Sequence, residues 1–169
     1  PVNELSSTNK VIRQRGTGNL PSGNAWWYQD IIHPFYETQP GDYLYYDIKF
    51  PTSSQTQVAG IDLEFPSNNL RDSGATDQNG IIAHPAANLA AYANNKWYHR
   101  QIKIPDARIG LNITSVEIAL EHNSLTTEVY YRNIYIGDAE GNVRFPIYWS
   151  GSYNFATERY GPGNNQYIN

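Results

Sequence analysis

The chain of 169 residues contains no cysteine and no methionine. The lack of cysteine excludes a disulfide scaffold, thiol catalysis and thiolate metal sites. No apolar run approaches the ~20 residues that a membrane-spanning helix needs, so we expect no membrane partner. Because Pro is residue 1 and Met is absent, we expect a processed piece of a longer protein, whose localisation signal has been removed.

Positive charge is also scarce. The chain has 12 Lys and Arg against 16 Asp and Glu, a formal net charge of −4, and no basic patch. This balance argues against nucleic acid as a partner. What the chain does have is aromatic side chains, at 14% with 14 Tyr and 4 Trp, together with 13 Gly and 10 Pro. Such a composition is typical of a secreted, extracellular all-β module.

Short alternating segments separated by turn residues predict an antiparallel β-sandwich. The segments cover residues 43–50, 58–65, 95–104, 113–121 and 128–136. We expect one sandwich domain over residues 1–149. We expect the Gly- and Asn-rich tail over residues 150–169 to wrap this domain or to link it to another module.

The segment NKWYHRQIKI, residues 95–104, contains the first candidate binding residues. Successive side chains of a strand point to opposite faces. If Ile102 and Ile104 face the core, the open face carries Trp97, His99, Gln101 and Lys103. A flat indole beside polar groups suits a polyhydroxylated ligand. The alternative is an inverted register with Trp97 in the core, since Trp is highly buried on average.

Two further regions supply candidates. Trp26 and Trp27 are adjacent, so on a strand one can pack in the core while the other forms an exposed platform. The alternative is that both are core residues. The long connection over residues 66–95 contains the polar run RDSGATDQNG, which is typical either of a binding loop or of an ordinary loop stabilised by Asx-turns. Its candidate ligand-binding residues are Asp72, Asp77, Gln78 and His84.

The succession GDYLYYDIKF, GIDLEF, KWYHRQIKIP, ITSVEIALEH and EVYYRNIYIGDAEGN resembles the jelly-roll carbohydrate-binding modules of bacterial polysaccharide-degrading enzymes. This resemblance implies a jelly-roll sandwich that does no chemistry and targets a larger secreted enzyme to a polysaccharide. It also implies a structural calcium, for which Glu4 and Asp138 are the candidate ligands. Arg132 stands where the family pattern commonly has an acidic residue, which puts this calcium site in doubt.

Since the net charge is negative, we expect the ligand to be a neutral glucan or a related polymer. We expect its site on the open face of Trp97, His99 and Gln101, with Glu117 contributed by the neighbouring strand and the loop over residues 72–84 at its rim.

Two other classes of function stay open: a protein-binding adhesion domain, and a small glycoside hydrolase or polysaccharide lyase on the same scaffold. Glu117 and Glu121 are four residues apart on one strand, which places them ~13 Å apart and too far for a hydrolytic pair. A cross-strand pair such as Glu64 with Glu117 remains possible.

Overall fold

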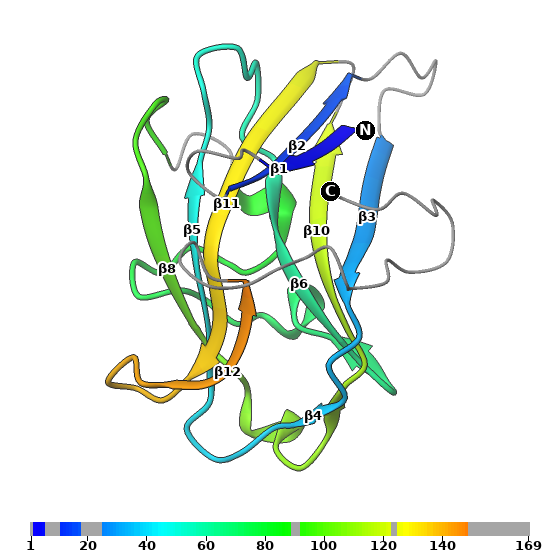
Figure 1. Ribbon diagram of the computed structural model, residues 1–169, viewed down its shortest axis with the longest axis vertical. Helices are drawn as coiled ribbons and strands as arrows, with labels where there is room; N and C mark the ends of the chain where they lie inside the picture. The colour runs from blue at the N-terminus through cyan, green and yellow to red at the C-terminus, as the bar shows by residue number, and fades with distance from the viewer. Residues whose placement is uncertain (1, 6–10, 18–24, 89–91, 123–124, 149–169) are drawn as a thin grey trace.

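The computed structural model describes residues 2–5, 11–17, 25–88, 92–122 and 125–148. Over these residues the chain is an all-β sandwich whose named strands pair antiparallel, which confirms the predicted fold class (Figure 1). Within the described chain, no helix has the length and apolar character needed to cross a membrane. The tail over residues 150–169 lies outside the described residues.

One layer is a six-stranded sheet. Its strand order is β1-β2-β11-β5-β8, and β12 also pairs with β11. The strands are β1 (Val2–Leu5), β2 (Ile12–Thr17), β5 (Tyr43–Lys49), β8 (Tyr98–Lys103), β11 (Thr126–Gly137) and β12 (Val143–Tyr148).

The other layer is a four-stranded sheet in the order β3-β10-β6-β7. Its strands are β3 (Ala25–Ile32), β6 (Ala59–Phe65), β7 (Asn68–Asn69) and β10 (Ser115–His122). A short pair, β4 (Tyr36–Glu37) with β9 (Asn112–Ile113), lies apart from both sheets. Three 3₁₀ turns complete the fold: η1 (Arg71–Ser73), η2 (Pro85–Asn88) and η3 (Asp106–Arg108).

The core lies between the two sheets and follows the alternation of the strands. Ile102 of β8 is fully buried on one side, and Leu63 of β6 and Ile118 of β10 are fully buried on the other. Burial of such side chains contributes roughly 25 cal/mol for each Å² removed from water. Because neighbouring residues of a strand point to opposite faces, the acidic residues of β6 and the glutamates of β10 are turned away from this core.

A buried arginine ties the long connection between β7 and β8 to the sandwich. Arg100 of β8 is fully buried, and its Nε donates to Asp77 Oδ2 at 2.9 Å. Its two Nη atoms donate to the hydroxyl of Tyr46 and to the carbonyls of Ile81 and Ile82. Asp77, expected as a ligand-binding residue, is therefore the buried partner of Arg100.

Gln78 also has a role in holding the connection against β8. Its side-chain Nε2 donates to the carbonyl of His99 at 2.6 Å, and its Oε1 accepts from the backbone N–H of Gln101 at 2.9 Å. The amide thus pairs with backbone groups on the side of β8 that faces away from β5. These bonds engage the side chain that the sequence suggested for ligand contact.

Candidate functional site

Three carboxylates meet on the outer face of the four-stranded sheet. The register of β6 with β10 places Asp62 opposite Glu117 and Glu64 opposite Ser115. Residues directly opposite in an antiparallel pair share a face, and diagonal neighbours are also within reach. Asp62, Glu64 and Glu117 each offer an oxygen within 4.8 Å of the other two. The cross-strand pair of Glu64 with Glu117 that the sequence left open is therefore formed.

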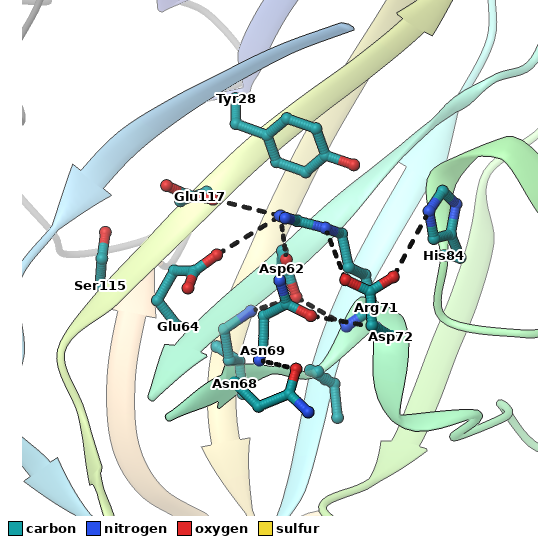
Figure 2. A network of polar contacts seen from close by, with 12 residues as sticks. Tyr28, Asp62, Glu64, Asn68, Asn69, Arg71, Asp72, His84, Ser115 and Glu117 are labelled. Carbon is teal, nitrogen blue, oxygen red and sulfur yellow. Dashed lines mark hydrogen bonds and ion pairs between the residues drawn. The ribbon is translucent and has the colours of Figure 1, made fainter. Parts of the chain in front are cut away.

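Arg71 of η1 reaches into this cluster, as Figure 2 shows. Its Nη1 lies 2.8 Å from Asp62 Oδ2, 3.4 Å from Glu64 Oε1 and 3.9 Å from Glu117 Oε2. Its guanidinium carbon lies 4.2 Å from the centre of the Tyr28 ring, a cation–π distance. The side chain of Asp62 is fully buried and also accepts the backbone N–H of Arg71 at 2.8 Å, so Asp62 holds η1 in place.

Crowding of carboxyl groups changes their protonation. Burial, a hydrogen bond with Asp30 and the charge of Glu64 raise the pKa of Glu117 from 4.5 to about 8. Burial raises the pKa of Asp62 from 3.8 to about 6, against the opposing effect of its bonds to Arg71. The contact between Arg71 and Glu117 at 3.9 Å is longer than a hydrogen bond, whereas Arg71 hydrogen-bonds to Asp62 at 2.8 Å. A pKa raised in this way favours the protonated form of Glu117 near neutral pH.

A row of aromatic and polar groups continues from this cluster along β3 and β10. The hydroxyl of Tyr28 donates to Glu121 Oε1 at 2.7 Å. Burial and this contact raise the pKa of Tyr28 well above its usual range, so it remains a neutral donor. His84 Nε2 lies 3.7 Å from Glu121 and 3.8 Å from Asp72, which places both loop candidates at the rim of this face.

Trp26 lies at the end of this row. It pairs with Glu121 in the β3–β10 register, and its side chain is 68% exposed. Trp27 points to the other side of β3, because a Cβ on Gly16 would lie 2.6 Å from its ring. One of the two adjacent tryptophans is therefore an exposed aromatic surface and the other packs inward, as the alternation of a strand allows.

The β8 candidates lie on the outer face of the six-stranded sheet. His99 is exposed, and its Nδ1 lies 2.8 Å from Asp47 Oδ1. Gln101 donates to the hydroxyl of Tyr45 at 2.8 Å, and Trp97 is half-buried. The predicted alternation of this strand is confirmed, and the inverted register is wrong.

The prediction that these residues lie on one sheet face together with Glu117 is wrong. β8 pairs with β5, whereas β10, which carries Glu117, pairs with β3 and β6 in the opposite sheet. The outer faces of two packed sheets point away from each other. The predicted composite site is therefore divided between two surfaces, one with Trp26 and Glu117 and the other with Trp97, His99 and Gln101.

Of the two residues expected to bind calcium, the structure describes the side chain of Asp138 only. Asp138 Oδ1 accepts the backbone N–H groups of Glu140 and Asn142, and its Oδ2 accepts from the Asn142 side chain. These bonds within its own turn are those of a structural turn residue. The side chain of Glu4 lies outside the described residues. Asp62, Glu64 and Glu117 could group around a cation, but Ca²⁺ needs 6–8 oxygens, and the Arg71 guanidinium already supplies positive charge there.

Sequence reasoning missed Arg71, Tyr28 and Asp30 as parts of this site. Arg71 begins a polar loop run whose carboxylate, amide and imidazole side chains are more typical ligand contacts, and Tyr28 follows two tryptophans, which are stronger signals of a stacking platform. The outward Asp62 and Glu64 were visible as an alternating pair, but only the register of β6 with β10 brings them to Glu117. The comparisons with known proteins found no protein-family model that matches the chain and no matching curated protein.

Proposed function

We propose that this chain binds a polysaccharide on the outer face of the four-stranded sheet. The observation that carries the proposal is the exposed indole of Trp26, on the same face as the network around Arg71. A sugar ring stacked on Trp26 would bury apolar surface at roughly 25 cal/mol per Å², on the order of 1–2 kcal/mol for one ring. The face in question is shown in part in Figure 2.

The polar groups beside Trp26 suit sugar hydroxyls. Glu121 and Asp72 supply acceptors, while His84 and Tyr28 supply groups that donate or accept according to their orientation. The excess of carboxyl groups over the one arginine in this network favours an uncharged polymer, such as a neutral glucan, over a uronate polymer at this face. In this role the chain would target a larger secreted enzyme to its substrate and would not itself be the enzyme.

Titration calorimetry with soluble neutral glucans tests this proposal. Trp26→Ala should weaken binding about tenfold, which corresponds to roughly 1.4 kcal/mol. Trp97→Ala is the matched control, because it removes the same side chain from the opposite sheet. Unchanged affinity after Trp26→Ala, with loss after Trp97→Ala, would move the site to the six-stranded sheet. Melting curves of both variants separate lost contacts from lost folding.

A second candidate function is glycoside hydrolysis on the same face. Carboxylate oxygens of Glu64 and Glu117 lie within 4.8 Å of each other, close to the ~5 Å carboxyl separation of retaining enzymes. In that chemistry Glu117 would protonate the glycosidic oxygen as its bond to the anomeric carbon breaks, and Glu64 would attack that carbon. Water would then cleave the glycosyl ester, giving its proton back to Glu117.

A reducing-end assay separates the two functions. If the chain only binds, the wild type releases no new reducing ends from a glucan that it binds. If it hydrolyses, release should stop in Glu64→Gln and in Glu117→Gln. It should continue in Glu140→Gln, an isosteric change in the exposed turn after β11.

A further inference from the structure

Two cations approach one indole on the outer face of the six-stranded sheet. Lys49, at the end of β5, has its Nζ 4.9 Å from the centre of the Trp97 ring and 5.3 Å from the centre of the Tyr130 ring. The guanidinium carbon of Arg132 lies 4.1 Å from the same Trp97 ring. We refer to Lys49, Trp97, Tyr130 and Arg132 as the cationic aromatic patch. All four side chains are partly accessible to solvent.

Strand pairing explains why these groups meet. In the register of β5 with β11, Lys49 is opposite Tyr130 and Asp47 is opposite Arg132. Lys49 and Arg132 are therefore diagonal neighbours on one face, at a separation that long side chains can span. Trp97 enters from the residue before β8, the strand that follows β5 in the sheet. Two strands and the residue before a third thus bring two like charges to one aromatic ring.

The charges of this patch are only partly compensated. Arg132 donates its Nε to Asp47 Oδ2 at 2.9 Å, and the same carboxylate also binds His99. Among the residues that the structure describes, no carboxylate lies within 4.0 Å of Lys49, whose recorded partners are aromatic rings. Next to the patch, Arg13 and Arg15 share the single carboxylate of Glu128, at 2.8 and 3.7 Å, so positive charge is in excess there as well.

An anion placed between Lys49 and Arg132 would offset their mutual repulsion. Aromatic rings attract cations through their faces, but they carry no net charge and therefore do not neutralise the positive charge of Lys49 and Arg132. A carboxylate matches the planar guanidinium and accepts from the ammonium. A sugar that bears such a group would also place its apolar face near Trp97 or Tyr130.

We propose that the cationic aromatic patch is a second carbohydrate site, which binds the uronate residues of an acidic polysaccharide. The inference rests on the proposed function only in taking the ligand to be a polysaccharide. It concerns the opposite surface of the sandwich and the opposite ligand charge. The formal net charge of −4 disfavours a long nucleic acid, which would meet repulsion from the protein as a whole.

Affinity electrophoresis in gels containing polygalacturonate or neutral β-glucan tests the inference. The wild type should be retarded by polygalacturonate, and the retardation should fall as salt is added. Lys49→Met removes the charge but keeps an apolar chain of similar length, and should weaken uronate binding about tenfold, or roughly 1.4 kcal/mol. Lys49→Arg should restore most of it.

The matched control is Lys103→Met, because Lys103 is exposed on the same strand face as Trp97 and is paired with Asp106 at 3.0 Å. It should leave uronate binding unchanged. Equal losses from Lys49→Met and Lys103→Met, no retardation by polygalacturonate at low salt, or equal retardation by single-stranded DNA would each overturn the inference.

Neutral-glucan binding through Trp26 should be the same in the wild type and in Lys49→Met. Failure of the cationic aromatic patch is therefore distinguishable from failure of the proposed function.

Discussion

Substitution of Asp77 tests whether the connection between β7 and β8 is a structural or a ligand-binding segment. Asp77→Asn removes the charge that faces Arg100 but keeps an oxygen that can accept the backbone N–H groups of Asn79 and Ile81, now 2.9 and 3.0 Å from Asp77 Oδ1. The change therefore leaves the backbone contacts in place and removes both the charge and the Oδ2 acceptor of Arg100 Nε. Arg100 is fully buried and would be left without a counter-charge.

Breaking a buried ion pair at one partner costs about 3–5 kcal/mol. For a chain of this length each kcal/mol shifts the melting temperature by roughly 2–4 °C, so a fall of about 10 °C is expected. Asp77→Ala also removes the acceptor of both backbone N–H groups and should cost about 1 kcal/mol more for each. The exposed pair of Lys103 with Asp106 supplies the control, since Asp106→Asn should cost less than ~1 kcal/mol.

Urea unfolding monitored by tryptophan fluorescence measures these changes, and titration with glucan at low temperature measures binding in the folded variant. Asp77→Asn should retain the affinity of the wild type, because Asp77 contributes to neither outer face. A loss of stability below ~1 kcal/mol, or a loss of affinity without a loss of stability, would refute the structural role.

Other consequences of the structure can be measured in the same way. A raised pKa of Glu117 means that the folded protein binds more protons than the unfolded chain between pH 4.5 and about 8, so the free energy of unfolding should fall as pH rises through this window, by at most ~1.4 kcal/mol per unit because solvent screens the group. Urea unfolding of Glu117→Gln should show a flatter profile from about pH 7 to 8, where Asp62 has completed most of its own titration. Gly16→Ala should destabilise by about 1–3 kcal/mol, because the new Cβ would lie 2.6 Å from the Trp27 ring, and an unchanged melting temperature would contradict this packing. Millimolar calcium should not raise the melting temperature above that in chelator, because the carboxylate of Asp138 already accepts hydrogen bonds from residues of its own turn. A rise in melting temperature that Asp138→Ala removes would instead support a calcium site at Asp138.

The alternation along single strands was predictable from the sequence. Ile102 and Ile104 point inward and His99 points outward, because the period of a strand is two and apolar side chains follow the core. The same reasoning gave the outward direction of Glu117. The alternation of a strand also explains why Trp26 is exposed while the adjacent Trp27 points inward.

The pairing of strands was not predictable in the same way. β8 and β10 are consecutive among the longer strands, yet they belong to different sheets. In a sandwich a loop can cross from one sheet to the other, and the sequence of the loop does not indicate with which strand the next one pairs. Asp77 could not be told from a loop ligand, since its partner Arg100 is distant in sequence and fully buried. Arg71 became part of the site only through contacts with residues of other strands.

The amide of Gln78 has a consequence for the behaviour of the protein in concentrated solution. β8 is the last strand of its sheet, and an unpaired strand offers a template to the strands of other molecules. Gln78 occupies the carbonyl of His99 and the N–H of Gln101, so a second chain cannot add to β8 at this point without displacing it. The residue that the sequence suggested for ligand contact thus covers part of an edge at which other chains could pair, next to the bridge of Asp77 with Ile102.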